Sequence, residues 1–292
     1  MLTWRIGDVT VTRIAELETT GGSRFILPDA TRDAVLPIAW LRPHFADEDG
    51  RLRMSIHALV VETPTRRIVV DTCLGNDKQG RRIPAWNDLH GPFLADLAAA
   101  GYARETIDTV LCTHLHVDHV GWNTMLVDGN WRPTFPNARY LMGRFEYAHW
   151  RDLSAQGHAQ RNAREDQRAV FADSVQPVFD AGLVDLVETD HRIDDAVSLI
   201  PTIGHTPGHV SVRIRSQGEE ALITGDFMHH PCQIARPDWA STADSDPATA
   251  RHTREHMLSS LAHTPTLVIG THFAAPTAGR IVRDGAAYRL KV

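Results

Sequence analysis

The amino-acid sequence predicts an α+β protein, one domain in which strands and helices alternate along the chain and strand outweighs helix. Segments rich in β-branched residues with a period of two, which is typical of strands, recur from one end of the chain to the other. Segments with helical spacing of apolar residues lie between them. No internal repeat, low-complexity tract or evident linker divides the chain, so we expect residues 1–292 to form a single domain.

Two hairpins are expected near the N-terminus. Residues 4–7 and 9–16 flank a Gly-Asp turn, and residues 55–63 and 66–72 flank a Pro-Thr turn. Between the hairpins, residues 19–50 are irregular and rich in proline, arginine and aromatic residues. This segment is too apolar for a solvated linker, so we expect it to form an N-terminal arm packed on the body or a lid over a site.

The remaining elements follow in chain order, and two of the helices carry terminal signals. Gly101 stands where a C-terminal glycine belongs, and Asp246 is a plausible N-cap before Pro247 at the first helical position. Helices are expected at residues 87–101, 144–150, 162–172 and 246–263. Strands are expected at residues 107–113, 138–143, 183–188, 197–202, 209–216, 221–226, 266–272 and 286–292.

Composition excludes several classes of protein. The net charge is −6 with acidic and basic residues mixed along the chain, so no basic stripe indicates a nucleic-acid surface. No apolar run is long enough to span a bilayer, and the N-terminus lacks the pattern of a signal peptide. The three cysteines are widely spaced and form no C-x-x-C, which argues against a disulfide framework or a thiolate zinc site. We therefore expect a cytoplasmic protein with neither nucleic acid nor membrane as partner.

The stretch CTHLHVDHVGWN, residues 112–123, concentrates groups that bind metals. His114 and His116 are two residues apart, so both imidazoles project to the same side of an extended segment. Asp118 and His119 follow as the chain turns at Gly121. A strand that ends in such a turn can direct two imidazoles at one ion and an aspartate–histidine pair at another.

Three later strands also end in side chains that can bind a metal. His209 closes the turn GHTPGH, Asp226 ends the apolar strand ALITGD, and His272 ends the apolar strand TLVIGTH. A carboxylate in such a place needs a partner or a metal. His205, at the start of the same turn as His209, is interpreted as a hydrogen-bonding loop residue. Four apolar strands that each end in a ligand type are difficult to explain by packing alone.

In their order along the chain, these motifs resemble the metallo-β-lactamase superfamily of hydrolases. The resemblance covers the chain from about residue 55 to the C-terminus and implies an αββα sandwich, two mixed β-sheets face to face with helices outside. It also implies two divalent metal ions. The implied ligands are His114, His116 and His209 for one metal, Asp118, His119 and His272 for the second, and Asp226 between them.

The chemistry of this ligand set agrees with the resemblance. Nitrogen and oxygen donors without thiolate suit Zn²⁺ and also tolerate iron, manganese or cobalt. Two such ions can hold a bridging hydroxide as a nucleophile at neutral pH. Asp118 would then act as a catalytic residue that orients the hydroxide and carries its proton to the leaving group.

Differences between this sequence and several branches of the superfamily limit the branches that it can resemble. True metallo-β-lactamases lack an aspartate at the position of Asp226, and the nucleic-acid-processing, flavin-dependent and glyoxalase II branches carry additional segments that this chain lacks. The layout is most similar to the lactonases of N-acyl homoserine lactones, related small-lactone hydrolases and methyl parathion hydrolase-like phosphotriesterases. The lactonases place a tyrosine three residues after the bridging aspartate. Here that position is His229, a candidate catalytic donor to the substrate or a group that supports the metal site.

These observations predict a hydrolase of esters or lactones in small, moderately hydrophobic molecules. Phosphotriester (organophosphate) hydrolysis is the alternative, and a non-catalytic metal-binding protein is a third hypothesis. The apolar residues of the arm either form a pocket wall or cover the edge of a sheet, and they also suggest a homodimer through the arm. The residues in question are Phe25, Ile26, Leu27, Trp40 and Phe45, with Trp122 beside the histidine motif.

Overall fold

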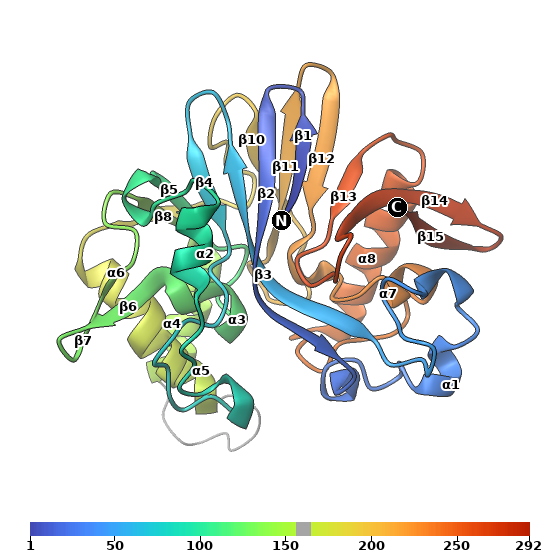
Figure 1. Cartoon of the computed structure of the whole chain (residues 1–292), viewed down its shortest axis with the longest axis horizontal. Coiled ribbons are helices and arrows are strands. Elements are labelled where there is room, and N and C mark those ends of the chain that lie inside the picture. The colour runs from blue at the N-terminus through green and yellow to red at the C-terminus, as the bar shows by residue number, and fades with distance from the viewer. Residues whose placement is uncertain (156–164) are drawn as a thin grey trace. The chain divides into compact units, whose positions relative to one another are not determined.

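The computed structural model describes residues 1–155 and 165–292, and Figure 1 labels most of its helices and strands. These residues divide into two compact units. The first consists mainly of residues 10–16 and 56–188. The second consists of residues 2–9, 17–55 and 189–292. Helices cover mixed sheets in both, which confirms the expected α+β class.

Most of a seven-stranded mixed sheet, with the order β1-β2-β3-β4-β5-β8-β9, belongs to the first unit. Its strands are β1 (Leu2–Ile6), β2 (Val9–Thr20), β3 (Arg53–Glu62), β4 (Arg67–Val70), β5 (Thr109–Leu111), β8 (Arg139–Gly143) and β9 (Val184–Val187). Strands β3 and β4 pair antiparallel, whereas β4, β5, β8 and β9 run parallel. Parallel neighbours need a crossover, and α2 (Phe93–Ala99) lies on the crossover between β4 and β5.

The helices of the first unit follow the parallel strands. They are α3 (Val117–Val120), α4 (Arg144–Ala155), α5 (Glu165–Val170), a π-helical turn (Phe171–Val175) and α6 (Gln176–Asp180). Helix α4 packs against β8 and β9. The hairpin β6 (Thr124–Val127) and β7 (Asn130–Pro133) forms a separate two-stranded sheet. No helix in the described part of the chain is both long and apolar enough to cross a bilayer.

A six-stranded sheet forms the framework of the second unit. Its strands, in spatial order, are β10 (Val197–Pro201), β11 (Val210–Ser216), β12 (Glu219–Ile223), β13 (Leu267–Ile269), β14 (Ala278–Asp284) and β15 (Ala287–Lys291). Only β12 and β13 pair parallel, and the connection between them carries α8 (Pro247–Leu261). The side chain of Asp246 accepts hydrogen bonds from the backbone at the start of α8, which confirms the predicted N-cap.

The arm, residues 19–50, is irregular as expected, with short helical turns that include α1 (Arg32–Val35). Leu27 and Phe45 are fully buried in the apolar core of the second unit, whereas Phe25 is 45% exposed. His230 fixes the arm through its Nε2, which lies 2.8 Å from the backbone oxygen of Phe45. Burial within the chain accounts for the apolar character of Leu27 and Phe45, and the homodimer expected from the sequence stays a prediction.

Several predicted boundaries differ from the structure. Helix α2 is shorter than the predicted 87–101, because Pro92 disfavours the helical conformation at the preceding residue. Gly101 has φ +94° just after this helix, as predicted. The hairpin β6–β7 and strand β14 were not expected. Of the predicted helix 162–172, residues 165–172 are helical and residues 162–164 lie outside the described part of the chain.

Candidate functional site

The candidate ligands of the first unit lie in the turn that follows β5. His114 and His116 come from this extended segment, and Nε2 of His114 lies 3.1 Å from Nδ1 of His116. Adjacent nitrogens around a tetrahedral zinc ion lie about 3.4 Å apart. The second nitrogen of His114 is 3.1 Å from the hydroxyl of Thr113. The two imidazoles therefore present a pair of nitrogens at a spacing that suits one ion.

The aspartate–histidine pair of this turn is oriented by a buried carboxylate. Nδ1 of His119 lies 2.9 Å from Oδ2 of Asp71, and its Nε2 lies 3.6 Å from Oδ1 of Asp118. Asp71 also accepts hydrogen bonds from the backbone N–H and the hydroxyl of Thr113. A carboxylate behind a histidine fixes the tautomer and the ring orientation of a metal ligand. Asp71, which the sequence reasoning missed, therefore prepares Nε2 of His119 for a metal.

Close backbone packing holds the turn in place. A Cβ atom at Gly121 would lie 1.9 Å from the carbonyl carbon of Leu74, so only glycine fits there. The indole of Trp122 donates a hydrogen bond of 2.6 Å to Glu16, which also accepts from the backbone N–H groups of Leu74 and Gly75. Burial raises the pKa of the Glu16 carboxyl. Trp122 is thus a buried part of the turn's support and does not form an open pocket wall.

The candidate ligands of the second unit are centred on Asp226, which follows β12. Its Oδ1 lies 3.2 Å from Nε2 of His272. Its Oδ2 lies 3.5 Å from Nε2 of His205 and 3.3 Å from Nε2 of His229. Imidazole nitrogens on both oxygens are the environment that a bridging carboxylate requires.

In His272 and His205, the ring nitrogen that faces away from Asp226 is held by a hydrogen bond. Nδ1 of His272 donates to the backbone oxygen of Ser55 at 3.0 Å. Nδ1 of His205 lies 2.9 Å from Oδ1 of Asp244, whose other oxygen accepts from the backbone N–H of Ser241. Burial raises the pKa of the Asp244 carboxyl. The arrangement repeats the Asp71–His119 pair of the first unit and directs Nε2 of His205 toward Asp226.

His209 is held differently from His205. Its Nδ1 lies 2.9 Å from the backbone oxygen of Thr202, and its Nε2 accepts a hydrogen bond of 2.7 Å from the backbone N–H of Asp226. Gly225 makes this contact feasible, because a Cβ there would lie 2.6 Å from Nε2 of His209. The hydrogen bonds therefore favour His205 over His209, the ligand expected from the sequence.

His229 is buried beside these candidate ligands, with a side chain that is 3% exposed. Its backbone N–H donates to Oε1 of Gln233 at 2.7 Å. Neither ring nitrogen has a hydrogen-bond partner among the described residues. Such an imidazole can bind a metal but is poorly placed to meet solvent.

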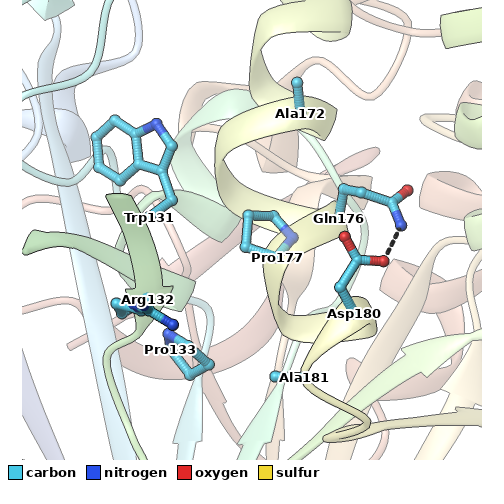
Figure 2. Close-up of a pocket in the computed structure, with 8 residues that line it drawn as sticks. All are labelled: Trp131, Arg132, Pro133, Ala172, Gln176, Pro177, Asp180 and Ala181. Atoms are coloured by element: carbon cyan, nitrogen blue, oxygen red, sulfur yellow. Dashed lines mark hydrogen bonds between the residues drawn. The ribbon is translucent and has the colours of Figure 1, made fainter. Parts of the chain in front are cut away.

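A pocket of about 330 Å³ opens elsewhere on the first unit (Figure 2). The side chains that line it are Trp131, Arg132, Pro133, Ala172, Gln176, Pro177, Asp180 and Ala181. Gln176 and Asp180 hydrogen-bond each other at 2.7 Å. The pocket contains none of the expected ligands, so we do not assign catalysis to it.

Comparison with protein families and curated proteins gives one family. The model described as the metallo-beta-lactamase superfamily matches residues 52–272. The N-acyl homoserine lactonase of Bacillus cereus is 22% identical over 178 residues, which are 57% of this chain and 60% of that protein. A lactonase of the same name from Bacillus sp is 24% identical over 178 residues, again 57% of this chain and 60% of that protein. The match thus spans less than two thirds of the length of these relatives.

Solved structures resemble the whole chain. The hydrolase AbOPH of the beta lactamase superfamily has a TM-score of 0.80 at 24% identity, covering 100% of this chain and 97% of that one. AidC, a dizinc quorum-quenching lactonase in complex with a product, has a TM-score of 0.79 at 21% identity, covering 99% and 95%. These likenesses confirm the fold class expected from the sequence.

Proposed function

Because the chain belongs to the metallo-beta-lactamase superfamily, we propose that it is a metal-dependent hydrolase of carboxylic ester or lactone bonds in small, moderately hydrophobic molecules. The observation that carries this proposal is that each unit presents buried imidazole and carboxylate groups already oriented by hydrogen bonds from behind. The relatives named N-acyl homoserine lactonase support lactones as the substrate class.

The ligand assignment follows the family, with one revision. In the set that the family implies, His114, His116 and a histidine of the turn before β11 would hold one metal, Asp118, His119 and His272 would hold the second, and Asp226 would contribute to both. For the turn we assign His205 in place of His209, because the ring of His209 is already engaged with Thr202 and Asp226. Nitrogen and oxygen donors at spacings of 3.1 to 3.6 Å suit Zn²⁺, and iron, manganese or cobalt as well.

The residues proposed for the site have different chemical roles. Bound metals supply Lewis acidity and a hydroxide nucleophile at neutral pH. Asp118 is the least buried carboxylate of the proposed set, with a side chain that is 16% exposed. We assign it the catalytic role of accepting a proton during attack and returning it to the leaving alkoxide. Asp71 and Asp244 hold the rings of His119 and His205 in the orientation that this arrangement requires.

Hydrolysis by the metal-loaded chain tests the proposal directly. The values of kcat/KM for N-acyl homoserine lactones, simple γ-lactones, aryl esters and aryl phosphotriesters are compared on one preparation. We expect lactones or esters to exceed phosphotriesters, and Asp118→Asn to abolish most of the turnover. An exposed histidine of α8 supplies the control, His256→Ala, which should leave turnover unchanged. Preference for phosphotriesters would replace the substrate class, and no turnover by metal-loaded protein would contradict the proposal.

A further inference from the structure

We propose that His229 is itself a metal ligand, which with His205 and Asp226 completes a set of two histidines and one carboxylate held entirely within the second unit. This inference rests on the proposed metal-dependent function and extends it. The sequence left two roles open for His229, a donor to the substrate and a group that supports the metal site. The geometry points to a direct bond to the metal on the Oδ2 side of Asp226.

The spacing of the three donor atoms fits a single ion. Oδ2 of Asp226 lies 3.5 Å from Nε2 of His205 and 3.3 Å from Nε2 of His229. Adjacent ligands about 2.1 Å from a metal are separated by roughly 3.0 Å in octahedral and 3.4 Å in tetrahedral geometry. One atom from each of the three residues lies within 4.8 Å of the others, and all three residues are buried. Two imidazoles and a carboxylate are also a donor set that divalent transition metals favour.

The burial of His229 requires a partner for its ring. A polar group removed from water without a hydrogen bond costs free energy, on the order of 1–3 kcal/mol. Both ring nitrogens of His229 are buried and have no hydrogen-bond partner among the described residues. The next residue provides a contrast, because the equally buried ring of His230 uses one nitrogen toward the backbone oxygen of Phe45 and the other toward the N–H of Cys232. The protein itself satisfies both nitrogens of His230, whereas a metal bound at Nε2 would satisfy one nitrogen of His229.

The surroundings of His229 fix its position without a hydrogen bond to its ring. Its backbone N–H donates to Gln233, and the amide of Gln233 donates in turn to the backbone oxygen of Trp239. The rings of His229 and His272 are nearly parallel, at 4° and 5.9 Å between centroids. His205 is fixed by Asp244. The second unit therefore holds all three donors in place before any metal binds.

A Co²⁺ titration of the full-length chain, freed of metal by a chelator, tests the inference without relying on activity. Proton NMR of the Co²⁺ protein shows strongly shifted N–H signals, one for each coordinated histidine that retains a ring N–H. In His229→Phe, which keeps a ring and removes both nitrogens, we expect one such signal to disappear. The dissociation constant of one Co²⁺ ion should rise tenfold or more, since loss of a group that only orients a ligand already costs roughly 10–100-fold.

The matched control is His256→Phe, the same substitution at an exposed histidine of α8, and it should reproduce the wild-type signals and affinity. If circular dichroism shows that His229→Phe does not fold, His229→Gln provides the same comparison with a smaller side chain. A folded variant with all wild-type signals and unchanged Co²⁺ affinity would overturn the inference. Failure of the wild-type chain to bind Co²⁺ would overturn the proposed function itself, so the wild-type sample alone distinguishes the two failures.

Discussion

The turn after β5 in the first unit and the strand ends of the second unit supply candidate ligands in different ways. In the first unit, His114, His116, Asp118 and His119 fall within six consecutive residues. In the second unit the candidates come from separate strand ends, and the turn before β11 offers two histidines for one role. In both units a buried carboxylate orients a candidate ligand histidine, Asp71 in the first and Asp244 in the second.

This difference shows where the geometry of a ligand set is encoded. In the first unit the local backbone fixes which side each ring faces, so spacing alone describes the set. In the second unit the identity of the ligand depends on which ring nitrogens the surrounding protein already uses. His205 and His209 have similar local sequence, but Nε2 of His205 lies 3.5 Å from a carboxylate oxygen of Asp226, whereas Nε2 of His209 accepts from the backbone N–H of Asp226. The predictions below test whether both units contribute to one chemistry.

The largest effect is expected from Asp118→Asn in the first unit. The amide cannot accept the proton that general acid–base catalysis requires, so kcat/KM for the preferred lactone or ester should fall roughly a thousandfold. Steady-state kinetics of metal-loaded variant and wild type measure the loss. Turnover within a factor of three of wild type would remove Asp118 from the reaction.

The next largest effect distinguishes the two histidines of the second unit. His205→Ala removes a proposed ligand, so the dissociation constant for one metal should rise roughly a hundredfold or more. His209→Ala removes hydrogen bonds instead, so the free energy of unfolding should fall by about 1–3 kcal/mol with little change in metal affinity. Competition with a chromophoric chelator and urea unfolding measure these quantities. The opposite pattern would restore His209 as the ligand.

The carboxylates behind the ligands should have similar effects in the two units. Asp71→Asn and Asp244→Asn each weaken the orientation of one histidine, so each should lower metal affinity roughly 10–100-fold. Asp246→Asn is a matched control, because asparagine also caps helices well and the side chain of Asp246 hydrogen-bonds the start of α8. If Asp244→Asn leaves metal affinity unchanged while Asp71→Asn lowers it, the proposed equivalence of the two units is wrong.

The smallest effect concerns acid sensitivity of the second unit. Burial lowers the pKa of His230 from 6.5 to about 4. The unfolded chain therefore binds a proton as pH falls below 6.5 while the folded chain does not, so stability falls with falling pH in this window. His230 alone should cost about 1 kcal/mol between pH 7 and pH 5.5. Urea unfolding of wild type and His230→Gln at both values measures it, and identical pH slopes would contradict the assignment.

The sequence predicted much of the fold because its strands carry a strong period-two pattern. It missed β6 and β7 although Asp128 and Gly129, both with positive φ, form the turn typical of a hairpin. It overextended α2 because the apolar spacing begins before Pro92, where the backbone cannot yet be helical. Such local signals were present and could have corrected the prediction.

The ligand set was less predictable than the fold. Asp71 directly follows an apolar strand, the same signal that identified Asp226, so it could have been found. The choice between His205 and His209 could not, because it depends on Thr202, Asp244 and the backbone of Asp226, which only the folded chain brings together. The arm residues Leu27 and Phe45 likewise fit a pocket wall or a core equally well until their burial is known.

Metal content of the purified wild-type chain, measured by mass spectrometry on the sample used for lactone hydrolysis, tests the central claim most directly. The account predicts about two divalent ions per chain, together with lactone or ester turnover that is lost on chelation and restored by Zn²⁺. A chain that takes up no metal after reconstitution, or one whose turnover persists without metal, would contradict it.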